Sequence, residues 1–331
     1  MRWIACELHS HTFHSDGRQS LSELAHGAKA LGFECVALTD HNTMTGLRGK
    51  EDVERETGVA IVSGMEWTTF FGHMVTIGLT DFVDWRPAVP GDIDAGIARV
   101  HAAGGIAGMA HPFRIGSPMC TGCFWEFDIR DWQALDYIEV WSGMFPSIKT
   151  DNARAFRLWT DKLNEGYRIA ATSGRDWHAQ EATDDPVSVT YLLLDEGEGS
   201  VTEQAARALA AGRAAVTMGP LLTLELRSET ANYRIGDRVP KEARGWRHEA
   251  VASVDFEARS GLWAFPDAGY EVILTSNAGV LGELRAEPSQ RDYRFDIPAG
   301  ALTWIRAELK GTVRGVRTTI AFTNAIYWDA K

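Results

Sequence analysis

Short apolar runs alternate with amphipathic segments between residues 3 and 211 of the chain. The apolar runs are rich in Val, Ile, Leu and Ala, which is typical of buried strands. We expect these strands at residues 3–8, 34–38, 59–65, 73–79, 105–110, 137–141, 167–172 and 188–194. The amphipathic segments predict helices at residues 21–31, 47–57, 93–103, 152–164 and 201–211.

The first of these helices carries a start signal. Ser20 precedes it and Glu23 follows three residues later, which is the pattern of a capping box. Strands that alternate with helices form parallel sheets, because each helix returns the chain to the same edge. About seven such units predict an α/β fold in which a barrel gathers its loops at one mouth.

The pattern changes near residues 212–219, after which the helical period disappears. Alternating apolar and polar positions predict strands at residues 221–226, 250–256, 271–275, 293–297, 302–309 and 318–328. Turn residues separate some of them, at 276–279 and at 298–300. We therefore expect a catalytic barrel over residues 1–215 and an antiparallel β-sandwich domain over residues 216–331.

Composition narrows the classes of function. The chain has 331 residues, 45% of them hydrophobic, and a formal net charge of −12, which argues against a long nucleic acid as partner. A small anionic substrate remains compatible if arginines gather locally. No apolar stretch is long enough to span a bilayer and no leader precedes residue 9, so we expect a cytoplasmic protein. Whether it forms a homo-oligomer stays open.

Histidines and acidic residues stand where predicted strands end. His9 and His11 are two residues apart, so on a strand they point to the same side. Asp176 and His178 repeat this arrangement after a later strand. The remaining candidates of this kind are Asp16, His41, Glu66, His73 and His111. Imidazole and carboxylate groups suit zinc, manganese or iron, so the pattern predicts a metal site.

Each of these residues also has an ordinary interpretation, since one histidine alone is usually structural. Six of the ten histidines, however, fall at strand ends together with acidic residues. By contrast, His26, His101 and His248 lie within predicted helices or the tail and are expected to be structural. The pair Cys120 and Cys123 has the spacing of half a zinc knuckle or a redox pair, but no second pair completes it, which favours an incidental loop pair.

The motifs in combination resemble those of the PHP (polymerase and histidinol phosphatase) metal-dependent hydrolases. They are His9-Ser-His11-Thr, Ser15-Asp16-Gly17, Thr39-Asp40-His41-Asn42, Gly64-Met65-Glu66 with Gly72-His73, Ala110-His111-Pro112 and Gly174-Arg175-Asp176-Trp177-His178. With the β-rich tail, the layout is most similar to the CehA/McbA-like branch. The chain departs from the usual pattern at Arg175, where a serine is more common.

The resemblance implies a distorted (β/α)7 barrel with two or three divalent metal ions. His9, His11 and Asp176 would hold one ion. Glu66 would bridge it to a second, held by His73 and His111, and the third would be held by Asp16, His41 and His178.

Adjacent dications lower the pKa of a bridging water, which predicts hydroxide as the nucleophile of a hydrolase. Arg114 and Arg175 follow or precede predicted ligands, so we expect them to bind a phosphate ester, with Arg18 as a third substrate-binding candidate. His14 is the candidate general acid, or else it orients a ligand. The expected activity is hydrolysis of a small phosphomonoester or phosphodiester. Two alternatives remain: an amide or carbamate hydrolase, and a non-catalytic metal-stabilised binding module.

Overall fold

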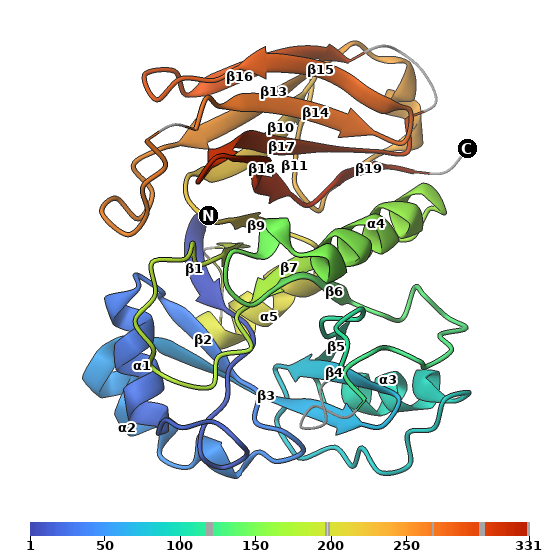
Figure 1. Cartoon of the computed structure of the whole chain (residues 1–331). Coiled ribbons are helices and arrows are strands. Elements are labelled where there is room, and N and C mark those ends of the chain that lie inside the picture. The colour runs from blue at the N-terminus through green and yellow to red at the C-terminus, as the bar shows by residue number, and fades with distance from the viewer. Residues whose placement is uncertain (117–121, 196, 198, 267, 298–301, 330–331) are drawn as a thin grey trace.

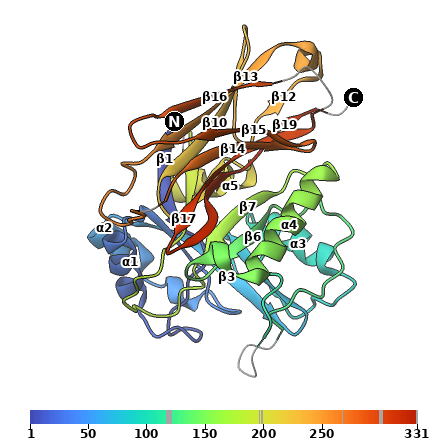
Figure 2. The same ribbon diagram turned by 45° about the horizontal axis from the view of Figure 1, so that its top comes forward.

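The computed structural model describes residues 1–331 except 117–121, 196, 198, 267, 298–301 and 330–331, and it is drawn in Figure 1. An N-terminal α/β part lies below a C-terminal β domain, and the N-terminus lies near their junction. Figure 2 shows the strands of the β domain lying across one end of the α/β part. The predicted combination of an α/β fold with a second, largely antiparallel β domain is confirmed.

Seven strands of the N-terminal part follow one another in a curved row. They are β1 (Arg2–Glu7), β2 (Cys35–Leu38), β3 (Ala60–Thr69), β4 (Gly72–Ile77), β5 (Ile106–Met109), β6 (Tyr137–Ser142) and β7 (Ala170–Gly174). Strands β1 to β3 are parallel, as are β5 to β7. Beyond the strands, Ser10 forms a bridge with Trp177, which joins the loop after β1 to the loop after β7.

Strand β4 departs from the parallel arrangement that repeated βα units predict. This strand pairs antiparallel with both β3 and β5, because a tight hairpin connects it to β3 where a helix would be needed for a parallel return. Strand β7 also begins at Ala170, three residues after the predicted start at 167. The carboxyl ends of the six parallel strands nevertheless share one edge of the sheet.

Helices connect or flank these strands. Their bounds are α1 (Leu21–Ala30), α2 (Lys50–Thr57), α3 (Ile93–Ala102), α4 (Thr150–Asn164) and α5 (Val201–Ala210), with short 3-10 turns η1 (Thr45–Leu47), η2 (Pro146–Ile148) and η3 (Lys241–Gly245). The predicted capping box of α1 is confirmed: Ser20 accepts from the backbone of Glu23, and the Glu23 carboxylate accepts from the backbone of Ser20. Ser200 and Glu203 form a second capping box at α5.

Two further strands lead from the α/β part into the β domain. Strand β8 (Val189–Leu194) pairs antiparallel with β1, and β9 (Ala214–Thr217) pairs antiparallel with β8. On its other side β9 pairs with β18 (Val316–Thr323) of the β domain. The predicted boundary between residues 215 and 216 therefore falls inside a strand that belongs to both parts.

The C-terminal domain consists of two packed sheets. One has the order β11 (Asn232–Arg234), β10 (Leu221–Arg227), β13 (His248–Asp255) and β16 (Asp292–Ile297). The other contains β12 (Arg238–Val239), β14 (Glu271–Ser276), β15 (Gly279–Arg285), β17 (Trp304–Val313), β18 and β19 (Ile326–Trp328). Neighbouring strands are antiparallel except β12 and β19, and the predicted turn at 276–279 joins β14 to β15.

Aromatic side chains join the two parts. The ring of Phe322 in β18 lies 5.0 Å from that of Trp141 in β6 and 5.7 Å from that of Trp159 in α4.

Cys6 and Cys35 are buried and free, as expected of small apolar residues in core strands. Cys120, and with it the predicted Cys120–Cys123 pair, lies outside the described residues, as does the predicted turn at 298–300. Within the described ranges, we find no helix with the length and apolar character needed to cross a membrane.

Candidate metal centre

The loops at the carboxyl edge of the strands bring the predicted ligands together. His9 and His11 follow β1, His41 follows β2, and a bridge pairs His41 with Glu66 in β3. The backbone N–H of Trp177 donates to the carbonyl of His9, and the carbonyl of Trp177 accepts from the N–H of His11. These two hydrogen bonds fix the segment that carries His9 and His11 against the loop that carries Asp176. Two strand-end motifs separated by more than 160 positions in the sequence thus lie side by side.

All nine predicted ligands fall into three overlapping groups of side chains. In each group the nitrogen and oxygen atoms that could bind a cation lie within 4.8 Å of one another. The groups are His9, His11, Glu66 and Asp176; Glu66, His73 and His111; and His11, Asp16, His41 and His178. This arrangement matches the sets expected from the sequence, with the addition that His11 also approaches the third group. The role of each residue as a ligand stays a prediction.

Glu66 lies at the centre of the first two groups and is fully buried. Its Oε2 is 3.2 Å from His9 Nε2 and 2.8 Å from His41 Nδ1, and its Oε1 is 3.0 Å from His73 Nδ1 and 3.2 Å from His111 Nε2. Burial by itself would raise the pKa of Glu66, but the surrounding imidazoles outweigh it and lower the pKa well below its usual value. The carboxylate is therefore ionised and offers both oxygens.

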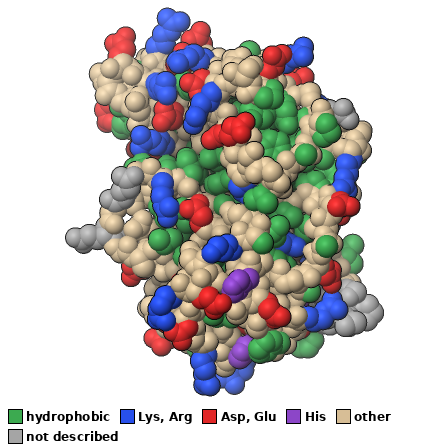
Figure 3. Space-filling view, turned by 90° about the vertical axis from the view of Figure 1, so that its left-hand side faces the viewer, with side chains coloured by type: hydrophobic (Ala, Val, Ile, Leu, Met, Phe, Trp, Pro, Cys, Tyr) green, Lys and Arg blue, Asp and Glu red, His purple; other side chains and the backbone are tan. Residues whose placement is uncertain are grey.

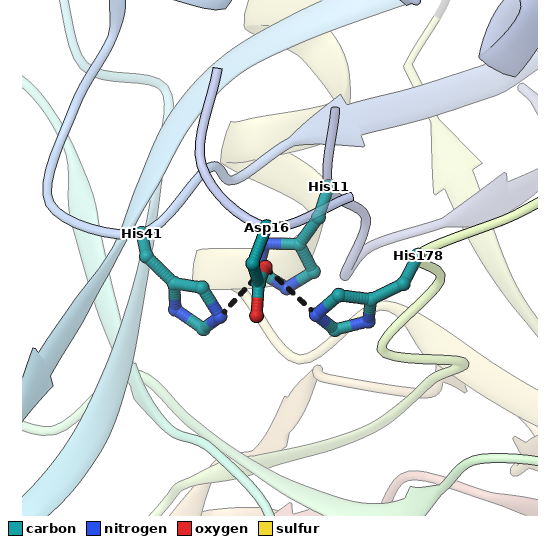
Figure 4. Close-up of side chains that lie close together, drawn as sticks. All are labelled: His11, Asp16, His41 and His178. Carbon is teal, nitrogen blue, oxygen red and sulfur yellow. Dashed lines mark ion pairs between the residues drawn. The ribbon is translucent and has the colours of Figure 1, made fainter. Parts of the chain in front are cut away.

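The third group is more open to solvent. Figure 4 shows Asp16 between His41 and His178, with His11 behind it. Asp16 Oδ1 lies 3.3 Å from His41 Nε2 and 3.0 Å from His178 Nε2. The side chain of Asp16 is 60% exposed, whereas His11 is fully buried. A cation at this position would be the one that solvent or a substrate reaches most easily.

Buried polar atoms that make no hydrogen bond indicate whether the site fits metal ions. Among the described residues, His9 Nε2, Glu66 Oε2 and Asp176 Oδ1 are buried and have no hydrogen-bond partner. Leaving such atoms unpaired is costly in a protein interior, and cations that accept their lone pairs remove the cost. Nitrogen and oxygen donors in this proportion suit zinc, manganese or iron. The residues present therefore fit divalent ions.

Two of these histidines use Nδ1 for a contact outside the centre, which leaves Nε2 to face a cation. His9 Nδ1 lies 2.6 Å from Glu139 Oε2, and His178 Nδ1 donates to the backbone carbonyl of Asp176 at 2.8 Å. Such hydrogen bonds hold the tautomer and the orientation of a histidine that binds metal. Glu139 is thus a positioning residue for His9.

The backbone is strained at three motif positions. Asn42, His111 and Asp176 have positive φ angles of 56°, 26° and 55°, which residues other than glycine rarely adopt. Strain of this kind occurs mainly at sites where function fixes the conformation. Here two of the three positions, His111 and Asp176, belong to the groups that contain Glu66.

Arg114 lies at the first group. Its Nη1 donates to Asp176 Oδ2 in a short contact, and its Nη2 donates to Ser142 Oγ at 2.5 Å. Burial by itself would lower the pKa of Arg114, but the charges of Asp176 and Glu139 outweigh it and raise the pKa. The guanidinium of Arg114 therefore binds one carboxylate oxygen of Asp176, while the other oxygen faces His9 and His11.

The other three predicted catalytic or substrate-binding residues lie further out. Arg175 places its guanidinium 4.1 Å from the ring centre of Trp177, and no described hydrogen bond joins it to the three groups. Arg18 is 77% exposed and pairs with Glu181 at 3.3 Å. His14 is exposed, with Nδ1 2.9 Å from Thr45 Oγ1. The structure therefore brings Arg114 to the centre and leaves these three at its edge.

Two buried acids near the centre were not recognised as site residues from the sequence. Glu139 contacts His9 as described, and Glu7 Oε1 accepts from the backbone N–H groups of His9 and Arg175 at 3.0 and 2.9 Å. Burial raises the pKa of Glu7 to about 7, although these N–H groups and the charge of Arg175 lower it. Each of these acids is an isolated acidic residue in a mainly apolar strand segment. This isolation is the sequence signal that could have identified them.

Two further polar residues fix the loops. Asp40 accepts from the backbone and hydroxyl of Thr12, both at 2.7 Å, and from Ser15 Oγ at 2.9 Å, so it holds the loop that presents Asp16. Lys149 donates to the carbonyl of Ser142 at 3.2 Å.

Three histidines lie away from the centre, as expected. His26 is on α1, His101 is on α3 beside Asp136, and His248 is in β13 beside Trp328.

Comparison with known proteins adds independent information. A sequence profile of the PHP domain matches residues 7–87. The chain is 40% identical over 63 residues to a 5'-3' exoribonuclease of Haemophilus influenzae, a match that spans 19% of this chain and 23% of that protein. It is 30% identical over 128 residues to an uncharacterized protein of Methanocaldococcus jannaschii, which spans 35% of this chain and 71% of that protein. The chain thus covers less than a quarter of the exoribonuclease.

One solved structure resembles the whole chain. It is a two-domain protein of Bacteroides vulgatus described as containing a predicted PHP-like metal-dependent phosphoesterase. The similarity covers 98% of this chain and 95% of that one, with a TM-score of 0.53 and 14% sequence identity. At this identity the similarity shows a shared two-domain fold.

Proposed function

The chain belongs to the PHP domain family, and from this premise we propose that it is a metal-dependent phosphoesterase that hydrolyses a small phosphomonoester or phosphodiester. The observation that carries the proposal is the set of three overlapping groups, which contain buried nitrogen and oxygen atoms that make no described hydrogen bond. A protein interior tolerates so many ionisable groups in contact only when opposite charges compensate them.

Two or three divalent ions would be held here. His9, His11 and Asp176 would bind one of them. Glu66 would be shared with a second at His73 and His111, and Asp16, His41 and His178 would bind the third. Bound ions of this kind polarise an ester and make hydroxide available near neutral pH as the nucleophile. Histidine and carboxylate ligands bind zinc, manganese and iron, so the availability of each metal in the cell helps to decide which one is bound.

Arg114 supplies the protein's own positive charge next to the reacting ester. A guanidinium presents two parallel N–H donors that match two phosphate oxygens. Its side chain is 24% exposed, so a phosphate oxygen can reach it while Asp176 and Ser142 keep it in place. We therefore assign to Arg114 the stabilisation of charge that develops on the phosphoryl group. The predicted roles of Arg18 and Arg175 at this group stay predictions.

His14 is the proposed proton donor to the leaving group. It is exposed, it precedes Asp16 of the third group by two residues, and Thr45 Oγ1 lies 2.9 Å from its Nδ1. Its Nε2 is then the atom that would carry the proton. A protonated imidazole can pass a proton to the oxygen of a leaving group, which is the role of a general acid.

The proposal is tested with purified protein and a panel of substrates: para-nitrophenyl phosphate, bis-para-nitrophenyl phosphate and an aryl carbamate. We expect hydrolysis of a phosphate ester that EDTA abolishes and that zinc, manganese or iron restores. Arg114→Gln should lower kcat by about 100-fold, in the range found for loss of one stabilising donor. Arg86→Gln serves as the control, because Arg86 is an exposed arginine whose ion-pair partner in the described structure is the surface residue Asp84. Turnover of the carbamate alone, or ester hydrolysis that EDTA does not affect, would overturn the assignment.

A further inference from the structure

A cavity lies between the N-terminal part and the β domain. Its volume is about 750 Å³, which is within the range of small-molecule sites, and sites of this kind often lie between domains. None of the nine candidate ligands lines it. The apolar part of its wall comes from both parts of the chain: Leu31, Trp177, Met218, Leu262, Trp263 and Phe265. Figure 3, which faces the side of the molecule on the left in Figure 1, shows hydrophobic side chains gathered between the two halves.

A buried cation without a full set of partners lies in this cavity. Arg175 is only 9% exposed, lines the cavity, and stacks on Trp177. Its Nη1 is buried and has no hydrogen-bond partner among the described residues. A buried N–H of a charged group without an acceptor is unfavourable, and an anion in the cavity would satisfy it.

Two of the three acidic residues that line the cavity pair with another arginine: Glu181 with Arg18 at 3.3 Å and Asp185 with Arg314 at 2.5 Å. The third, Asp184, makes no described ion pair with Arg175. The buried acid Glu7 accepts from the backbone N–H of Arg175. The guanidinium of Arg175 thus remains available to a ligand.

We propose that this cavity binds a small molecule with a planar aromatic body and one anionic group, a carboxylate or a phosphate, which Arg175 recognises. The aromatic body fits the indole and phenyl rings of Trp177, Trp263 and Phe265, which favour stacked and edge-on contacts with another ring. The anion meets the planar donor face of the guanidinium. This proposal does not depend on the activity assigned to the metal centre.

The cavity shares part of its wall with a pocket at that centre. A smaller pocket of about 310 Å³ is lined by Arg175 together with Asp176 and His178. Arg175 therefore lies on the wall of both spaces, and its neighbour in the sequence belongs to the first metal group. An aromatic anion in the cavity is either the part of the substrate remote from the hydrolysed ester or a separate ligand that binds beside it. The chemistry of recognition is the same in both cases.

Isothermal titration calorimetry on the full chain tests the site with 2-naphthoate and its neutral counterpart 2-naphthamide. We expect one naphthoate per chain, bound at least tenfold more tightly than the amide, because a hydrogen bond to a charged group contributes about that factor. Arg175→Gln should remove the difference between the two probes, and Arg86→Gln should leave it intact. Naphthoate that binds no better than naphthamide, or a preference that survives Arg175→Gln, would overturn the proposal.

A second variant keeps the test valid if loss of Arg175 prevents folding. Leu262 lines the cavity and is 41% exposed, so Leu262→Asp adds a negative charge to the wall at little cost to stability. It should weaken naphthoate several-fold and leave naphthamide nearly unchanged, since like charges repel. Equal effects on both probes would contradict an anion site.

Inhibition kinetics then separate the two sources of the ligand. If the cavity holds part of the substrate, naphthoate competes with an aryl phosphate and raises KM. If it holds a separate ligand, naphthoate changes kcat or has no effect on KM. Calorimetry detects the site even in a protein that hydrolyses none of the esters, so failure of the proposed activity and failure of this inference are distinguishable.

Discussion

Glu66→Gln is the most informative single change, because this carboxylate belongs to two of the three groups. The substitution keeps the size and shape of the side chain and removes its charge. It replaces one carboxylate oxygen that faces the imidazoles by an amide nitrogen, which donates where a metal ligand must accept. The perturbation is therefore confined to the electrostatics of the centre.

The expected magnitude follows from burial. Glu66 is 0% exposed, and imidazole nitrogens lie 2.8–3.2 Å from its oxygens. Removing one member of a buried charge pair costs roughly 3–5 kcal/mol. Because each 1.4 kcal/mol is about tenfold in binding, the metal affinity of the two groups that share Glu66 should fall by at least ~100-fold.

The assay has two readouts on the same samples. Metal content after dialysis is measured by inductively coupled plasma mass spectrometry, and turnover is measured with the best phosphate ester of the panel. We expect Glu66→Gln to lose more than half of its metal and nearly all of its activity. The matched control is Glu56→Gln, whose carboxylate lies 3.5 Å from His26 but is 61% exposed on the surface. A Glu66→Gln protein that keeps its metal and its activity would refute the view that Glu66 holds the centre together.

Three further predictions concern single positions. His14→Asn should slow hydrolysis of phenyl phosphate by about 100-fold or more and that of para-nitrophenyl phosphate far less, since a good leaving group needs no proton; equal losses would exclude a proton donor. In Gly174→Ala the new Cβ would lie 2.5 Å from the Cβ of His9, so metal content and kcat should fall together while the circular dichroism spectrum stays native. Burial raises the pKa of Tyr191 to about 12, so the unfolded chain ionises first, and stability is lost as the pH rises from about 10 towards 12. Urea unfolding of Tyr191→Phe should show a decline that is smaller by up to ~3 kcal/mol over this range; identical curves would contradict the assignment.

The sequence predicts the elements well where the signal is local. The α1 helix begins at Leu21 because Ser20 and Glu23 cap it, and these two residues are only three positions apart in the sequence. The direction of β4 is not local, because an apolar run has the same pattern whether the strand pairs parallel or antiparallel. Strand β9 is short and was not predicted at all, since its pairing with β8 and β18 involves partners on both sides of the predicted domain boundary.

The split between β18 and β19 has a similar cause. The sequence predicts one strand over residues 318–328, but Asn324 interrupts it. The side chain of Asn324 accepts from the backbone N–H of Ala171 at 2.7 Å and donates to its carbonyl at 2.9 Å. This contact spans 153 positions in the sequence, so no window along the chain contains it.

For the site, the sequence indicates residue types and strand ends, and these suffice to nominate the nine candidate ligands. It does not indicate where long side chains point. Arg114 and Arg175 are both next to predicted ligands, yet one donates to Asp176 and the other stacks on Trp177 in a cavity whose far wall comes from the β domain. The cavity that Arg175 lines includes residues such as Trp263, which lie far along the chain.

The pairing of β9 with strands of both parts has a consequence for dissecting the molecule. A fragment that ended after β9 would contain all nine candidate ligands, but it would lose β18 and expose the backbone N–H and C=O groups of β9 along one side. Open strands of this kind recruit further chains and promote aggregation. The β domain thus acts as a cover for this edge, and the catalytic half is expected to stay monodisperse only with its C-terminal neighbour attached.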